Sequence, residues 1–173
     1  HGAVVFACDR RTREELGEEA AAELEAMGAT LCLGDTYLDT VHEMDLVLRT
    51  PGMKPYLPEF EAARKNGTVV TSEMELFLSL CPAKVFAVTG SDGKTTTTTL
   101  VGKIFESAGR TTHVAGNIGY PVSAVAMSDC KEDMSVIEVS SFQLESIETF
   151  HPRVAALLNI TEDHLNRHGT MAE

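Results

Sequence analysis

The chain has 173 residues, 43% of them hydrophobic and 23% charged, and it contains no tryptophan. No apolar run approaches the ~20 residues that a membrane-spanning helix needs, so we expect no membrane association. With 14 basic and 26 acidic side chains, the net charge is −12, which argues against a protein that binds nucleic acid through its overall field. Any anionic ligand must therefore be held by a local site.

The cysteines and the first residues of the chain bear on its compartment. Cys8, Cys32, Cys81 and Cys130 are widely spaced and include no C-x-x-C pair, which favours reduced thiols in a cytoplasmic protein. The chain opens on an apolar, strand-like segment without a leading methionine or a charged leader, which is unlike a signal peptide. We therefore expect a piece of a longer cytoplasmic protein.

The first part of the chain alternates strand and helix patterns. An apolar run at residues 4–7 predicts a strand, and the segment after it predicts a helix that ends at Gly28. The apolar positions on one face of this helix are Leu16, Ala20, Leu24 and Met27. Six glutamates cover its remaining surface, which is typical of a solvated face: Glu14, Glu15, Glu18, Glu19, Glu23 and Glu25.

The same alternation continues to the end of the chain. Strands are predicted at residues 30–33, 46–48, 69–70, 85–88, 112–114, 135–139 and 154–158, and helices at 59–65, 73–80 and 95–108. This order predicts an α/β fold with mostly parallel sheets and helices on their faces. Because the pattern breaks and restarts around Pro82, we expect two domains, residues 1–82 and 83–173.

The strongest chemical signal lies between the strand at 85–88 and the helix that follows. The sequence there is Thr89-Gly90-Ser91-Asp92-Gly93-Lys94-Thr95-Thr96. A glycine-rich turn between a strand and a helix presents backbone N–H groups to phosphate, the lysine adds a full charge, and the threonine hydroxyl after it can bind Mg²⁺. The match to the usual phosphate-loop pattern is incomplete, since Val88 stands where its first glycine belongs. The alternative is a glycine turn with a surface lysine.

Three further polar groups follow predicted strands or lie in glycine turns. Glu138 lies near the end of an apolar strand, where ligands of doubly wound sheets collect, and could bind Mg²⁺ or simply form a salt bridge. His164, in Asn159-Ile160-Thr161-Glu162-Asp163-His164, could be a metal ligand, a general base or a structural residue. Asn117, in Gly116-Asn117-Ile118-Gly119, could hydrogen-bond a substrate or a phosphate.

Together these residues resemble the Mur ligases, and the string Ser140-Ser141-Phe142-Gln143-Leu144-Glu145 points to the D-glutamate-adding branch. The match extends, more loosely, to Asp9, Thr50-Pro51-Gly52 and Glu73-Met74-Glu75-Leu76-Phe77. The resemblance implies a partial Rossmann-like domain followed by a partial P-loop-type ATPase domain. It implies a bacterial, cytoplasmic and monomeric ligase that uses ATP and Mg²⁺ in peptidoglycan precursor synthesis. It would add D-glutamate to UDP-N-acetylmuramoyl-L-alanine through an acyl phosphate.

The resemblance also implies roles for single residues. Lys94, Glu138 and His164 would be catalytic, and Thr95, Glu138 and His164 would hold Mg²⁺. The nucleotide would be bound by the loop residues Gly90, Ser91, Asp92, Gly93, Lys94, Thr95 and Thr96. The muramoyl substrate would be bound by Asp9, Arg10, Arg11, Gly52, Asn117 and Ser140. The chain departs from the family at two positions. Asp92 stands where the family usually has Asn, which adds negative charge beside the phosphates, and Asn166 stands where the family usually has Asp.

Two other readings remain open from the sequence. Another Mur ligase or a folylpolyglutamate synthase shares the Gly-Lys-Thr loop, and the amino acid accepted by the full-length protein would separate these. A nucleotide-binding module that joins no substrates would hydrolyse ATP without an acceptor. Since the family's adenine and D-glutamate sites lie beyond residue 173, we expect the parent protein to be a ligase and these 173 residues alone to be inactive.

Overall fold

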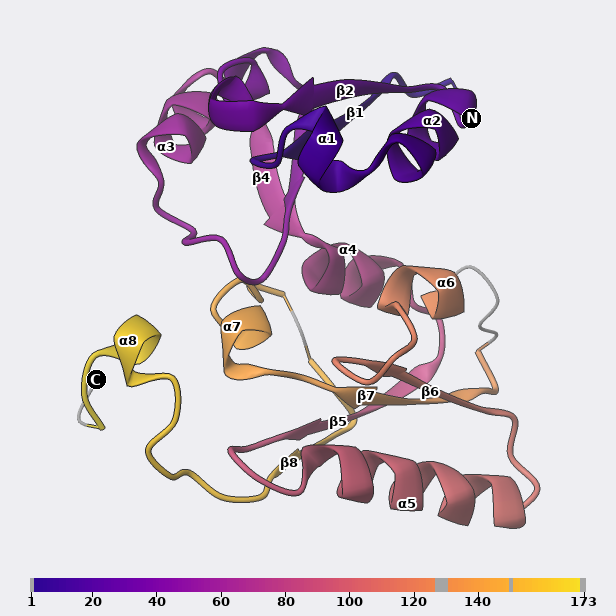
Figure 1. Ribbon diagram of the computed structural model, residues 1–173. Coiled ribbons are helices and arrows are strands. Elements are labelled where there is room, and N and C mark those ends of the chain that lie inside the picture. Colours follow the sequence, from indigo (N-terminus) through magenta and orange to yellow (C-terminus); the bar gives the residue numbers. More distant parts are fainter. Residues whose placement is uncertain (1, 127–130, 150, 172–173) are drawn as a thin grey trace. The chain divides into compact units, whose positions relative to one another are not determined.

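The computed structural model describes residues 2–126, 131–149 and 151–171, and its chain forms two compact units (Figure 1). Residues 1–47 and 56–70 make up the first unit, and residues 48–55 and 71–173 make up the second. Within the described residues, no helix has both the length and the apolar character needed to cross a bilayer.

The first unit is built on two parallel strands. Strand β1 (Val5–Asp9) pairs with β2 (Ala29–Leu33), so that Cys8 lies opposite Cys32 and Asp9 opposite Leu33. Its helices are α1 (Arg13–Leu16), α2 (Glu18–Ala26) and α3 (Pro58–Lys65), with short 3-10 turns η1 (Gly34–Thr36) and η2 (Val41–Glu43). Strands β3 (Leu46–Arg49) and β4 (Val69–Ser72) pair with each other and lead into the second unit.

The helix predicted to run up to Gly28 is two helices, so that prediction was wrong in one respect. Gly17 adopts φ +94, a backbone conformation that interrupts a helix, and it separates α1 from α2. The break changes which side chains face inward: Ala21 is buried, whereas Met27 is 78% exposed. All six glutamates are exposed as predicted. Two of them, Glu18 and Glu25, form ion pairs with Arg13.

The cysteines that the structure describes, Cys8, Cys32 and Cys81, are free thiols. Cys8 is exposed, and Cys32 and Cys81 are half-buried. Desolvation and the neighbouring Cys32 thiol raise the pKa of Cys8 to about 11. Cys130 lies outside the described residues.

The second unit contains a four-stranded sheet with the order β6-β7-β5-β8, and every pairing in it is parallel, as predicted. The strands are β5 (Lys84–Thr89), β6 (Thr112–Gly116), β7 (Met134–Glu138) and β8 (Val154–Leu157). The helices are α4 (Glu73–Leu80), α5 (Lys94–Ser107), α6 (Val122–Ala126), α7 (Ser141–Leu144) and α8 (Leu165–His168). The short helices α6, α7 and α8 carry no periodic signal and were not predicted.

Helices cover the two faces of this sheet, with α5 on one face and α4 with α6 on the other (Figure 1). The core on the α4 and α6 face joins side chains from both helices, from β5, β6 and β7, and from the residue after β7: Met74, Phe77, Val85, Ala87, Ala115, Val122, Val125, Ile137 and Val139. Successive strand residues point to opposite faces, so Val88 and Glu138 belong to the α5 face. The first residues of α5 therefore face the end of β7.

Helix α4 packs in the second unit, although the predicted first domain, residues 1–82, contains it. Two of its carboxylates reach neighbouring elements: Glu73 accepts hydrogen bonds from Ser123, and Glu75 accepts from Glu148 and Thr149. The compact units are thus divided differently from the predicted domains, whose limits stay a prediction.

A close backbone approach fixes the end of β7. Gly116 lies opposite Glu138 in the β6–β7 pairing and adopts φ +107. A Cβ at Gly116 would come within 2.1 Å of the Glu138 carbonyl oxygen. The next residue, Asn117, donates its N–H to that same carbonyl at 3.0 Å. Only glycine is therefore compatible with this junction.

We predict that Gly116→Ala lowers the free energy of unfolding by about 3 kcal/mol or more, because the clash adds to the cost of a positive φ. The matched control is Gly119→Ala, at φ +64 with no atom within 4 Å of the added methyl group. The control should lose only about 1–2 kcal/mol. Urea denaturation of both variants measures the difference, and equal losses would contradict the prediction.

Candidate functional site

The loop between β5 and α5 brings its lysine back over its own backbone. Gly90 at φ +138 and Gly93 at φ +80 make the turn, and Gly93 is the residue from which α5 begins. The Lys94 ammonium donates to the carbonyls of Gly90 and Ser91, both at 2.8 Å. The loop thus holds a positive charge at the N-terminus of a long helix, where the helix dipole also favours anions.

The same loop is hydrogen-bonded to the segment that follows β8. Asn159 Oδ1 accepts from the Asp92 N–H at 2.9 Å, and Asn159 Nδ2 donates to the Asp92 carbonyl at 3.0 Å. The Ser91 hydroxyl accepts from the Thr161 N–H at 2.9 Å and donates to the Thr161 carbonyl at 3.2 Å. The Ser91 N–H donates to the Asn159 carbonyl. Five hydrogen bonds therefore hold the loop's shape from outside the loop.

Glu138 is a buried carboxylate at the C-terminal end of β7, with 1% of its surface exposed. Its Oε2 accepts from the Thr95 hydroxyl at 2.8 Å, and its Oε1 accepts from Asn117 Nδ2 at 3.0 Å. Three elements far apart in the chain thus meet at one carboxylate. Burying a carboxylate is costly unless polar or charged groups compensate it, and the Thr95 and Asn117 donors do so here.

Ser140 and Gln143 form a capping box at the start of α7. The Gln143 N–H donates to the Ser140 hydroxyl at 3.3 Å, and the Ser140 N–H donates to Gln143 Oε1 at 2.9 Å. The Ser140 hydroxyl also donates to Gln143 Oε1 at 3.1 Å. Ser140 therefore orients the turn after β7 and also lines the cavity described below.

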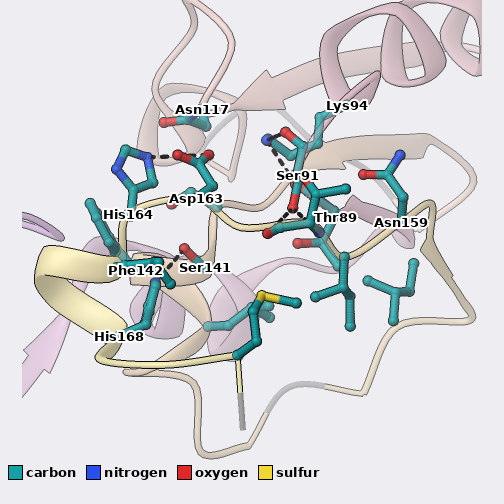
Figure 2. Close-up of a pocket in the computed structure, with 18 of the residues that line it drawn as sticks. Thr89, Ser91, Lys94, Asn117, Ser141, Phe142, Asn159, Asp163, His164 and His168 are labelled. Carbon is teal, nitrogen blue, oxygen red and sulfur yellow. Dashed lines mark hydrogen bonds and ion pairs between the residues drawn. The ribbon is translucent and has the colours of Figure 1, made fainter. Parts of the chain in front are cut away.

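His164 has an unusual backbone conformation. Its φ of +52 places it in the left-handed region, and it is the residue before α8. Its ring lies 4.8 Å from the ring of Phe142, centre to centre, and its Nε2 lies 3.7 Å from Asp163 Oδ2 (Figure 2). Non-glycine residues in this region often mark functional sites, since surrounding contacts must hold them there. Here the Phe142 ring is such a contact.

Several of these residues line one cavity of about 400 Å³ (Figure 2). Predicted residues that line it are Gly90, Ser91, Lys94, Asn117, Ser140 and His164. Glu138 accepts a hydrogen bond from Asn117 in the cavity wall, and Thr95 donates a hydrogen bond to Glu138. Of the other loop residues, Asp92 is fastened through its backbone to Asn159, Gly93 begins α5, and Thr96 is exposed on that helix.

The remaining predicted substrate residues lie outside this cavity. In the first unit, the Asp9 carboxylate accepts from the Arg11 N–H and guanidinium, which lowers the pKa of Asp9. Arg10 and Arg11 line a second cavity there, of about 470 Å³. Gly52 lies in a turn of the second unit, where its carbonyl accepts from Arg167 at 2.9 Å.

Several residues that shape the site have no role predicted from the sequence. Arg167 pairs with Glu145 at 2.6 Å and lies over the Phe142 ring, 4.9 Å from its centre. The hydrogen bond from Arg167 holds the pKa of Glu145 below its usual value. His168 Nε2 lies 2.9 Å from the Ser141 hydroxyl (Figure 2). No local signal separates these residues from ordinary surface residues.

Comparisons with known proteins identify the family of this chain. The Mur ligase middle domain family matches residues 88–173, which include the loop, Glu138 and His164. The chain belongs to the Mur ligase family. A UDP-N-acetylmuramoylalanine--D-glutamate ligase of Symbiobacterium thermophilum is 47% identical over 172 residues, and one of Clostridium botulinum strain Hall is 46% identical over 173. Each match covers 99% of this chain but only 37% of the relative's length.

A solved structure supports the fold. It is UDP-N-acetylmuramate:L-alanyl-gamma-D-glutamyl-meso-diaminopimelate ligase from Neisseria meningitides, with a TM-score of 0.55 and 21% sequence identity. The match covers 92% of this chain and 54% of the other. At this identity the likeness concerns the fold, which is that of a Mur ligase.

Mur ligases are ATP-dependent, and the donors of this chain fit ATP and Mg²⁺. Mg²⁺ prefers oxygen ligands, and the Thr95 hydroxyl and the Glu138 carboxylate supply two oxygens that are hydrogen-bonded to each other at 2.8 Å. Lys94 and the N-terminus of α5 supply the positive charge that phosphates require. Within the described residues, no group of three or more His, Cys, Asp and Glu side chains could hold a metal by itself.

We predict that Asn159→Ala lowers the free energy of unfolding by about 1–2 kcal/mol, because two hydrogen bonds to the Asp92 backbone are lost. The matched control is Asn166→Ala, since Asn166 is exposed and its side chain makes no hydrogen bond within the described part of the chain. Its change should stay within about 0.5 kcal/mol. Denaturation and amide exchange at residues 90–93 measure both variants. Equal losses of stability and equal exchange rates would show that the Asn159 side chain does not support the loop.

The Glu145–Arg167 pair should make stability depend on pH. The folded pKa of Glu145 is lowered from 4.5, so its contribution is present above that value and is lost as the pH falls through the folded pKa. The stability difference between wild type and Glu145→Gln should therefore be constant near neutral pH and shrink below 4.5. Denaturation as a function of pH measures it, with Glu148→Gln as an exposed control. A difference independent of pH would refute the prediction.

Proposed function

We propose that the parent protein of this chain joins D-glutamate to UDP-N-acetylmuramoyl-L-alanine with hydrolysis of ATP, in the cytoplasm. The observation that carries the proposal is the 46–47% identity to ligases of that name along 99% of the chain. The site supports it, because the glycine-rich loop and His164 line one cavity, and the buried Glu138 carboxylate is hydrogen-bonded to Asn117 in the cavity wall. The printed names of these relatives supply the two substrates.

The reaction proceeds in two transfers. A carboxylate oxygen of the muramoyl substrate attacks the γ-phosphorus of ATP, and ADP leaves. The D-glutamate amine then attacks the acyl carbon, phosphate leaves, and the nitrogen gives up a proton. Both transfers move negative charge between oxygens, so the residues that hold and neutralise phosphate control the rate.

The residues of the chain divide this work. Lys94 can exchange its two carbonyl acceptors for phosphate oxygens, which offer a stronger, charge-assisted hydrogen bond. Thr95 and Glu138 would hold Mg²⁺, with Asn117 orienting the carboxylate. Bound Mg²⁺ would neutralise charge on the phosphoryl group in transfer. His164, kept in place by Phe142, would be a further ligand or would contact the muramoyl substrate.

The other assigned residues act on the substrates. Asn117 and Ser140 would also contact the muramoyl substrate from the cavity wall. Asp9, Arg10, Arg11 and Gly52 would bind its nucleotide end. The Asp92 side chain is exposed, and its negative charge would weaken ATP binding relative to an asparagine.

The test uses the full-length enzyme. Phosphate release should require ATP, UDP-N-acetylmuramoyl-L-alanine and D-glutamate together, and Lys94→Ala should lower kcat about 100-fold or more. Lys103→Ala is the matched control, because Lys103 lies on the same helix and pairs with Glu106 at the surface. Its rate should stay within about twofold. Incorporation of another amino acid, or ATP hydrolysis without an acceptor, would overturn the proposal.

A further inference from the structure

The Arg167 guanidinium donates more hydrogen bonds than an ion pair with one carboxylate would need. Its side chain is 10% exposed. Nε and Nη2 donate to the two Glu145 oxygens at 3.2 and 2.6 Å. Nη1 donates to the Gly52 carbonyl at 2.9 Å, and Nη2 also donates to the carbonyls of Pro51 and Met53 at 3.4 and 3.2 Å. One side chain therefore joins α8, the end of α7 and the turn at residues 50–53.

Two arginine side chains donate hydrogen bonds to the carbonyls of this turn. Arg49, buried at the end of β3, donates to the Met53 carbonyl at 2.9 Å and to the Thr50 carbonyl at 3.4 Å. Arg167 approaches from α8, more than a hundred residues further along the chain. A planar fork can reach a carboxylate and a row of carbonyls at once, whereas a lysine ammonium cannot.

This arrangement fixes the direction of one N–H group. The peptide bonds are trans, so the C=O of Pro51 and the N–H of Gly52 point in opposite directions. Because Arg167 draws the Pro51 carbonyl inward, the Gly52 N–H points away from the guanidinium. Among the described residues, the Gly52 N–H donates no hydrogen bond, while the Met53 N–H closes the turn onto the Thr50 carbonyl at 3.1 Å. An outward N–H of this kind suits an oxygen acceptor on a ligand.

The same guanidinium also supports the other side of the site. It lies over the face of Phe142, 4.9 Å from the ring centre, and Phe142 in turn packs against His164 at 4.8 Å. Phe142 also lies 5.5 Å from the His168 ring. Arg167 thus contacts the turn at residues 50–53 directly and reaches the histidine at the cavity through Phe142.

We propose that Arg167 is a positioning residue for the nucleotide-sugar substrate. It orients the turn at residues 50–53 so that the Gly52 N–H meets an oxygen of that substrate, and through Phe142 it holds His164 at the reacting end. The proposal rests on the proposed function for the identity of the substrate. The contacts by which Arg167 orients the turn are independent of the proposed function.

The hold on the turn is tested in the 173-residue chain without any activity. In Arg167→Lys, amide exchange at Met53 measured by NMR should accelerate at least fivefold, while amides of β5 and β7 keep their rates. The matched control is Arg13→Lys, because Arg13 makes comparable contacts with two glutamates in the first unit. It should leave Met53 unchanged. Unchanged exchange at Met53 in Arg167→Lys would overturn the proposal.

Kinetics of the full-length enzyme test the consequence. Arg167→Lys should raise the KM for UDP-N-acetylmuramoyl-L-alanine at least tenfold and leave the KM for D-glutamate within twofold. Phe142→Leu, which keeps the turn contacts, should leave both KM values within twofold and lower kcat at least fivefold. Equal increases in both KM values in Arg167→Lys, or the same KM change in Phe142→Leu, would overturn the proposal. Absence of ligase activity in the wild type would instead overturn the proposed function, with the exchange result unaffected.

Discussion

The Glu138 carboxylate is the constraint on which the site depends. It is buried at the end of β7, and the Thr95 hydroxyl and the Asn117 amide hydrogen-bond to it from two different segments. A buried charge needs such donors, so the start of α5 and the turn after β6 cannot move independently of β7. Gly116 makes the arrangement possible, because any side chain there would strike the Glu138 backbone.

The glycine-rich loop between β5 and α5 is held in a comparable way, by groups outside itself. Its glycines permit the turn, but Asn159 and Thr161 determine where Ser91 and Asp92 lie. Since β8 pairs with β5, the segment that follows β8 emerges beside the loop that follows β5. The parallel sheet therefore delivers both the loop and its support to the same edge. Preorganised N–H groups and a lysine bind an anion at lower entropic cost than mobile ones would.

Several polar residues have a structural part in this site beside the chemical part that we propose for them. Ser140 caps α7 while lining the cavity, and His164 begins α8 in a left-handed conformation beside Phe142. Arg167 satisfies Glu145 and three backbone carbonyls together. Substituting such residues changes packing and chemistry at once, so the readouts that separate them are ratios of kinetic constants and local exchange rates rather than activity alone.

The sequence by itself determined the strands, the longer helices, the parallel α/β class and the glycine-rich turn before α5, because apolar periodicity and glycine turns are local properties. It did not show the break at Gly17 or the short helices α6, α7 and α8, because four or five residues carry no period. Only the tertiary structure decided that Asn159 supports a loop 67 residues away and that Arg167 reaches Gly52 across 115. Such partners are chosen by how the strands and helices pack, and the energy of each hydrogen bond depends on atoms that no local pattern brings together.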